Sequence, residues 1–349
     1  MTDIVSNVGA PSAEPVARPL TLILNRQARR LSDRSPVREA IERGRHVLGT
    51  RLDVVETRSL AELDAVMDEL AREPPETVLV AGGDGSYMAS LSSLVTAFAK
   101  RGRSEEALPA IGLLPGGTVS TVARNWGFHG GGLFANADRD AARYVTRFLE
   151  ELASGRTVVT RRPTLRVTTQ EGGRVGFIAG AGLVSRFFEV YDAEGARGYG
   201  GAASIVARVF AGSFAQGALA KRILDPVRCT IEVDGAAAPF DRTSLLCASV
   251  VRDLGLGMKL LYRAGESLER FHVVSSSLGP ARLGPQLPLV RMGLPLVGTR
   301  VDALANEVTL RFPPGEGAYV LDGELLRSDA VSITAGPIIR VVGLRSDRP

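Results

Sequence analysis

The stretch TVLVAGGDGS at residues 77–86 decides the fold of this chain. Its first half is an apolar run typical of a buried strand, and the segment from Tyr87 to Lys100 behind it is typical of a helix. Glycines let the backbone approach a ligand closely, and a helix start presents unpaired N–H groups. Strand, glycine turn and helix therefore predict an anion site. A plain βα turn without a ligand is the alternative, and the short motif alone does not separate the two.

A second unit of the same kind follows at residues 110–126. The apolar run AIGLL leads into PGGT at 115–118, and Val119 to Trp126 opens another helix. The carboxyl ends of neighbouring parallel strands meet at one edge of a sheet, so the two turns predict one crevice lined with amide donors and hydroxyls. Polyphosphate is the natural ligand of such a crevice. Neither turn is a P-loop, because the lysine of that motif is missing.

The chain divides into two halves by pattern. Alternating strands and helices run from residue 19 to 155, and near-continuous apolar strands predict an α/β domain with a parallel sheet covered on both faces. From 156 onward the pattern changes to short strands with turn signals, which predicts an antiparallel β domain. Residues 1–18 are polar and rich in Ala and Pro, and we expect a disordered tail there.

Composition excludes some classes of function. The two cysteines have neither metal-ligand nor redox spacing, which indicates free thiols, and three unpaired histidines argue against a zinc hydrolase. No secretory signal and no apolar stretch of about 20 residues is seen, so we expect a cytoplasmic protein that meets membranes only peripherally.

Arginines are concentrated at residues 25–51, with eight of them against three acidic residues. A solvated helix face explains most of them. The functional readings are ATP phosphates for Arg26 and an anionic membrane surface for the others. Nucleic acid fits less well, because no aromatic residues are interleaved with the arginines.

Three motifs resemble the diacylglycerol kinase catalytic family of lipid kinases, which includes sphingosine and ceramide kinases. They are GGDGS at 82–86 for the family's GGDGT, LPGGTVSTVAR at 114–124 for its L-P-x-G-T stretch, and Asp322-Gly323-Glu324 for its D-G-E. Two departures, NRQAR at 25–29 for N-P-x-S-G and Ser120 for an asparagine, indicate a divergent member of bacterial type.

The resemblance implies a lipid kinase that uses ATP and Mg²⁺. It implies a nucleotide-binding catalytic domain at 19–155, a β-sandwich domain for the lipid at 156–335, and a C-terminal strand within 336–349 that returns to the first domain. Asp322 is implied as the base, Asp84 as support for phosphates and Mg²⁺, and Glu324 as a neighbour of the metal or the acceptor hydroxyl. The residues implied to contact the nucleotide are Asn25, Arg26, Thr57, Gly82, Gly83, Asp84, Gly85, Ser86, Gly117 and Thr118.

The pair Asp322 and Gly323 also has a purely structural reading, because Asp-Gly is a strong hairpin signal. If the segment is extended instead, Asp322 and Glu324 face the same side and suit a base and a metal ligand. Asp253 is a weaker candidate for a second Mg²⁺ site, and a plain loop is the alternative.

The leading acceptors are diacylglycerol, ceramide and sphingoid bases. The nearest rival is an NAD kinase, which shares GGDG, and a rival of another class is a non-catalytic lipid- or nucleotide-binding module. A membrane lipid is the expected partner, with peripheral contact to an anionic membrane surface, no nucleic acid, and a homodimer as an open alternative.

Overall fold

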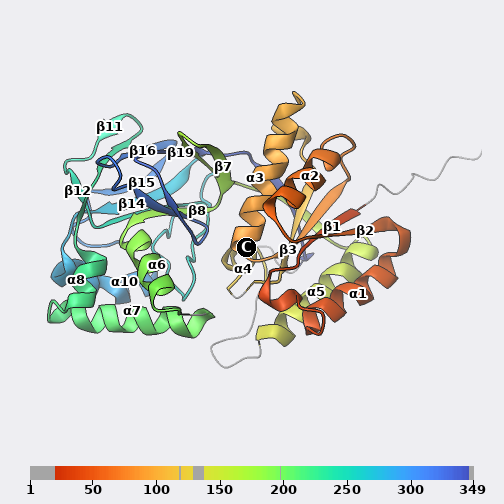
Figure 1. Ribbon diagram of the computed structural model, residues 1–349, viewed down its shortest axis with the longest axis horizontal. Helices are drawn as coiled ribbons and strands as arrows, with labels where there is room; N and C mark the ends of the chain where they lie inside the picture. Colours follow the sequence, from red (N-terminus) through yellow and green to blue (C-terminus); the bar gives the residue numbers. More distant parts are fainter. Residues whose placement is uncertain (1–19, 118, 129–136, 197, 346–349) are drawn as a thin grey trace, which may run out of the picture.

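The computed structural model describes residues 20–117, 119–128, 137–196 and 198–345, and the predicted tail at 1–18 lies outside them (Figure 1). The first sheet has the strand order β2-β1-β3-β4-β20-β5. Its strands are β1 (Leu20–Asn25), β2 (Leu52–Thr57), β3 (Thr77–Gly82), β4 (Ala110–Pro115), β5 (Val158–Arg162) and β20 (Ile339–Gly343). All neighbours pair in parallel except β5, which is an antiparallel edge strand. The predicted α/β class is confirmed.

Helices cover both faces of this sheet, as predicted (Figure 1). On one face α1 (Pro36–Leu48) packs against α5 (Ala137–Ala153), and on the other α2 (Leu60–Leu70) packs against α3 (Asp84–Lys100). The start of α1 follows from its sequence, because the Ser35 hydroxyl accepts a hydrogen bond from the Arg38 N–H at 3.1 Å and Pro36 takes the first helical position.

Helix α3 begins three residues earlier than the sequence pattern indicated. Gly83 is the extended N-cap, and the Ser86 hydroxyl accepts a hydrogen bond from its N–H at 3.4 Å. Asp84, Gly85 and Ser86 therefore form the first helical turn instead of a loop before it. The sequence did not predict this helix start, because glycine is generally a poor helix former, although it is tolerated at an N-cap.

The second half of the chain is built on two antiparallel six-stranded sheets, as predicted. One sheet contains β6 (Leu165–Thr169), β7 (Gly172–Gly176), β10 (Thr230–Val233), β11 (Ala236–Ala237), β16 (Glu307–Arg311) and β19 (Ala330–Ala335). The other contains β8 (Ile178–Gly182), β13 (Leu245–Ser249), β14 (Phe271–Ser276), β15 (Val301–Ala305), β17 (Ala318–Leu321) and β18 (Glu324–Arg327). A two-stranded sheet, β9 (Val227–Arg228) with β12 (Arg242–Thr243), completes the strands of the described residues.

Helices gather at one end of this half, beside the second sheet (Figure 1). They are α6 (Leu183–Ala193), α7 (Gly198–Phe214), α8 (Ala218–Leu224), α9 (Pro280–Leu283) and α10 (Leu287–Met292). They enclose a second hydrophobic cluster, distinct from the main core that runs through the first sheet. In the described part of the chain no single helix is long and apolar enough to span a membrane, and one bent pair, α7 with α8, passes by length and composition only.

Candidate functional site

The strand order of the first sheet creates a switch point between β1 and β3. Chain connections leave in opposite directions there, and ligands of open α/β sheets bind at such points beyond the carboxyl ends of the strands. Asn25 ends β1, and its side-chain amide donates to the Ser86 hydroxyl at 2.8 Å across this point. The buried Thr57 ends the neighbouring strand β2. Three of the nucleotide residues implied by the motifs therefore meet at one edge.

The two glycine turns lie at the same edge and pack directly on each other. The N–H groups of Gly116 and Gly117 both donate to the Gly82 carbonyl, at 2.7 and 2.8 Å. A Cβ atom on Gly83 would lie 3.2 Å from the Gly117 Cα. The predicted common edge is present, but backbone contact closes the space between the turns. A ligand of this edge must lie beside the joined turns, and Thr118 falls outside the described residues.

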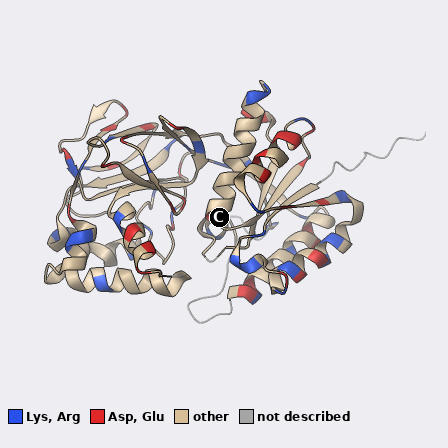
Figure 2. Ribbon diagram, in the orientation of Figure 1, with Lys and Arg blue, Asp and Glu red and all other residues tan. Residues whose placement is uncertain are grey.

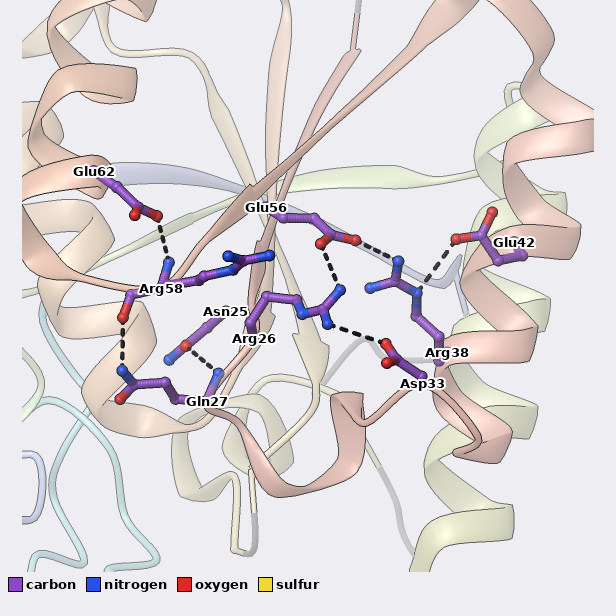
Figure 3. Close-up of polar contacts among 9 residues, drawn as sticks. All are labelled: Asn25, Arg26, Gln27, Asp33, Arg38, Glu42, Glu56, Arg58 and Glu62. Carbon is purple, nitrogen blue, oxygen red and sulfur yellow. Dashed lines mark hydrogen bonds and ion pairs between the residues drawn. The ribbon is translucent and has the colours of Figure 1, made fainter.

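Charges at this edge are largely paired (Figure 3). Arg26 forms ion pairs with Glu56 at 2.9 Å and with Asp33 at 3.3 Å, and Arg38 also binds Glu56. Burial alone would raise the pKa of Glu56, but hydrogen bonds from Arg38 and Arg26 outweigh it and lower the pKa. The Arg26 guanidinium is thus already compensated.

Arg58 is a cation at this edge that the motif analysis did not identify. It follows β2 directly, is exposed, and its guanidinium forms no hydrogen bond or ion pair with any residue the structure describes (Figure 3). Its backbone is held on both sides, since its N–H donates to Glu62 at 2.7 Å and its carbonyl accepts from Gln27 at 2.6 Å. A fixed backbone with an uncompensated cation suits an anionic ligand. The only sequence signal was its position after a strand end.

Asp84 joins the two glycine units through its carboxylate. The carboxylate accepts hydrogen bonds from the N–H groups of Thr121 at 2.8 Å and Val122 at 2.9 Å, and so caps α4 (Thr121–Asn125). Burial raises the pKa of Asp84, and these backbone hydrogen bonds oppose the shift. The aspartate in the first motif thereby fixes the helix after the second motif.

Asp322 lies in the two-residue turn between β17 and β18, with φ of 49°. The hairpin reading is therefore correct. The extended-strand argument is wrong, because a residue at positive φ in a turn does not continue the alternation of β18. The side chain nevertheless points inward and is only 6% exposed, and its carboxylate accepts from the N–H groups of Phe177 at 3.0 Å and Ile178 at 2.9 Å.

The environment of Asp322 opposes its ionisation. Burial, followed by the negative charge of Asp84, raises the pKa of Asp322 well above its ordinary value, and Glu324 contributes in the same direction. Glu324 reaches the first glycine motif, since a Cβ on Gly85 would lie 2.9 Å from its Oε1 atom. Its carboxylate lies 3.7 Å from Arg174, and burial raises its pKa. The three predicted carboxylates thus share one neighbourhood, supplied by α3 and the β17–β18 hairpin.

An apolar cavity of about 400 Å³ opens onto two of these carboxylates. Asp84 and Asp322 line it together with Thr121, and the rest of the wall is dominated by hydrophobic side chains of the second half. Phe187, Phe188 and Tyr191 of α6 are among the lining residues. The opposite wall comes from α7 and from the segment between α9 and Leu296. Residues far apart in the sequence form this cavity, so no local sequence motif predicts it.

The weaker candidate Asp253 has a structural role. Its carboxylate accepts from the Gly255 N–H at 2.8 Å within its own loop, and no group of three metal-ligating side chains was found among the described residues.

Comparison with known proteins agrees with the motifs. Residues 19–147, which contain strands β1 to β4 and both glycine turns, match the model of the diacylglycerol kinase catalytic domain. This match confirms, over residues 19–147, the resemblance drawn from the sequence. No curated protein matches the chain.

Solved structures extend the likeness to the whole fold. A diacylglycerol kinase from Bacillus anthracis str. Sterne is similar with a TM-score of 0.60 at 12% identity, covering 96% of this chain and 100% of the other. A second structure from the same organism, described as a candidate diacylglycerol kinase, has a TM-score of 0.60 at 13% identity, covering 94% and 98%. At such identities the likeness establishes the fold.

Proposed function

We propose that this protein is an ATP- and Mg²⁺-dependent lipid kinase that transfers the γ-phosphoryl group to a hydroxyl of a membrane lipid. The observation that carries the proposal is the apolar cavity that ends at Asp84 and Asp322. An acyl or sphingoid chain fits its hydrophobic wall, and pockets for such ligands commonly have volumes of roughly 300–1,000 Å³. A chain held there brings its hydroxyl headgroup to the carboxylates, next to the phosphate-binding edge. Diacylglycerol, ceramide and sphingoid bases all meet this requirement.

The transfer assigns a role to each part of the site. The acceptor oxygen attacks the γ-phosphorus, the bond to the ADP oxygen breaks, and the hydroxyl proton moves to Asp322. Asp322 is held for this role by the two backbone N–H groups of β7–β8, which also favour its ionised form. The helix start at Asp84–Ser86 and the hydroxyl of Ser86 face the nucleotide phosphates, with Asn25 fixing that hydroxyl.

The residues present fit a magnesium ion. Mg²⁺ prefers oxygen ligands and is usually held by one or two carboxylates together with substrate phosphates. Asp84 and Glu324 are the candidate ligands. Burial and then the negative charge of Asp84 raise the pKa of Asp322, and a cation would offset that charge. When bound, the ion would neutralise charge that develops on the transferring phosphoryl group.

The cavity also weighs against the NAD kinase alternative. A nicotinamide dinucleotide presents ribose hydroxyls and phosphates, and leaving these without partners in an apolar wall is unfavourable. The polar side chains lining the cavity are few, and they gather mostly at its carboxylate end. A non-catalytic module, the other alternative, has no need for a buried carboxylate whose ionisation is opposed.

The test is turnover of Asp322→Asn with radiolabelled ATP and a panel of acceptors: diacylglycerol, ceramide, sphingosine and NAD. Asparagine keeps the turn conformation and one acceptor oxygen for Phe177 and Ile178 but cannot take the proton. A positioned base contributes roughly 10²–10⁴-fold, so lipid turnover falls by that order while ATP affinity in calorimetry is retained.

The chain supplies a matched control in Asp234→Asn. Asp234 also precedes a glycine, has φ of 48°, and accepts hydrogen bonds from two backbone N–H groups, but it is exposed and distant from the cavity wall. This variant keeps full turnover. Phosphorylation of NAD but of no lipid, or near-normal lipid turnover by Asp322→Asn, contradicts the proposal.

A further inference from the structure

The outer face of the cavity wall has an unusual distribution of hydrophobic residues. Among the described residues eight large hydrophobic side chains are exposed, and five of them lie on this wall: Tyr199, Phe214, Met292, Leu294 and Val297. Tyr199 and Phe214 belong to α7, and the other three lie at or after the end of α10. Tyr199 also lines the cavity, whereas the other four do not. These two elements also supply cavity-lining residues from their inner sides. One layer of protein therefore separates the lipid cavity from an exposed apolar surface.

The two segments are in contact. Helix α7 packs against α9 and against the short helical turn Gly284–Gln286 that leads to α10. A Cβ on Gly284 would lie 2.2 Å from the Cβ of Ser213, which shows how closely the backbones approach. The exposed sides of these two neighbouring segments are hereafter called the α7–α10 face.

The charges of this face are predominantly basic. Residues 198–224 and 278–300 contain six exposed basic residues and no acidic one: Arg208, Lys221, Arg222, Arg282, Arg291 and Arg300. Arg208 is ion-paired with Glu194, which follows α6, whereas the other five form no ion pair with any residue that the structure describes. Figure 2 shows α7 as a largely uncharged helix, with basic residues on it and on α8. Hydrophobic side chains with an excess of cations complement a surface of anionic headgroups over an apolar interior.

We infer that the α7–α10 face docks the protein onto an anionic lipid bilayer. The inference rests on the proposed lipid-kinase function, which supplies the reason for this wall to meet a bilayer: an acceptor chain that leaves the membrane enters the cavity directly behind it. The exposed side chains insert among the headgroups, and the arginines and Lys221 bind lipid phosphates. Activity on membranes then depends on residues that take no part in phosphoryl transfer.

The basic stretch 25–51, which the sequence suggested for this purpose, is less suited. Arg26, Arg30 and Arg38 are paired there with carboxylates. Val47 is the single exposed large hydrophobic side chain among those residues. Charge without exposed apolar surface supports weak, salt-sensitive attraction but no insertion.

The experiment is vesicle flotation with two matched triple variants. The docking triple is Phe214→Ser, Met292→Ser and Val297→Ser, whose side chains are 65%, 62% and 71% exposed and do not line the cavity. The control triple is Val47→Ser, Leu60→Ser and Val159→Ser, which are 59%, 64% and 58% exposed elsewhere on the surface. Equal exposure makes loss of folding equally improbable in both. Circular dichroism verifies that each is folded.

On vesicles of phosphatidylcholine with phosphatidylglycerol, the docking triple partitions about tenfold or more weakly than wild type, since two interfacial methylene groups already contribute about that factor. The control triple binds like wild type. Arg291→Gln with Arg300→Gln weakens binding about fivefold per residue at low salt and has no effect on pure phosphatidylcholine. Equal binding by both triples, or equal loss in both, overturns the inference.

Two further readouts separate the alternatives. If the docking triple converts a dimer into a monomer in light scattering while vesicle binding stays unchanged, a second copy of the chain covers this face and the inference is wrong. Turnover of a short-chain lipid in solution needs the site but no bilayer, so the docking triple retains it. Wild-type protein that binds vesicles through this face but phosphorylates no lipid refutes the proposed function and leaves the docking face standing.

Discussion

Gly83 and Gly117, each from one of the two glycine turns, are in backbone contact: a Cβ on Gly117 would come within 2.4 Å of the Gly83 Cα. Real Cβ atoms do not approach a backbone atom so closely, so the absence of a side chain at 117 is a requirement of the fold. The glycine motifs are usually understood through their ligand. In this protein the two glycine turns also hold the carboxyl ends of β3 and β4 together.

The first prediction concerns this contact. Gly117→Ala forces the two turns apart, and overpacking of this kind costs about 1–3 kcal/mol in the free energy of unfolding. Urea denaturation measures the loss. Gly200→Ala is the control, because Gly200 has open space around its Cβ position and lies in α7, so that variant is neutral or slightly stabilised. Equal stability of both variants contradicts the contact.

The second prediction tests the lipid cavity by filling it. Ala202 of α7 lines the cavity, whereas its neighbour Ala203 faces outward. Ala202→Trp occupies space that the acyl chain needs, so turnover of a long-chain acceptor in detergent micelles falls by an order of magnitude or more while ATP affinity stays the same. Ala203→Trp is the matched control and retains turnover. Unchanged turnover of the Ala202→Trp variant would mean that this cavity does not bind the acceptor.

The third prediction distinguishes two arginines at the proposed nucleotide edge. The guanidinium of Arg58 has no partner in the part of the chain that the structure describes, whereas Arg26 is compensated by Glu56 and Asp33. We expect Arg58→Gln to weaken ATP binding about tenfold or more, because a hydrogen bond to a charged group contributes about 1.5–3 kcal/mol. Arg26→Gln leaves ATP affinity nearly unchanged in the same calorimetric titration. The reverse order of effects assigns the phosphate contact to Arg26, as the basic stretch at 25–51 suggested.

The fourth prediction follows from the buried thiols. Burial raises the pKa of both Cys229 and Cys247 to about 12. The thiolate is the reactive form, so iodoacetamide at pH 8.5 modifies neither cysteine in the native protein and both in urea, as mass spectrometry detects. Because the folded pKa lies above the unfolded value of about 8.5, the contribution of the thiols to stability is complete below pH 8.5 and is lost as the pH rises towards 12. Rapid alkylation of either cysteine in the native protein would contradict the burial of these thiols.

Local signals made the first sheet and its edge predictable. Strands β1, β3 and β4 are nearly unbroken apolar runs, and each glycine turn lies directly after β3 or β4. Asp84 and Ser86 were identified from the glycine turn that follows β3, and Asn25 was identified through the family resemblance. The start of α3 at Asp84 was missed because its capping is supplied by Gly83 and Ser86, a pair without a strong propensity signal.

The cavity and the charge pairing were not predictable in this way. The inner wall of the cavity combines residues near 184, 206 and 290, which are far apart in the chain and have no common spacing. The compensation of Arg26 depends on Glu56 from another strand. Asp322 was identified by its motif, but its burial depends on contacts with β7 and β8. Because Asp322 lies in a turn at positive φ, the alternation of side chains along a strand could not predict which way it points.

Strand β20 lies between β4 and β5, although some 220 residues separate it from β4 in the sequence. The sheet that positions Asn25, Gly82 and Asp84 is therefore incomplete until residue 343 has left the ribosome. Synthesis proceeds from the N-terminus at about 5–20 residues per second, so the early strands wait many seconds for their last partner. During that wait the side of β4 that pairs with β20 is open to wrong pairing, and a chain that ends before residue 339 leaves it without that partner.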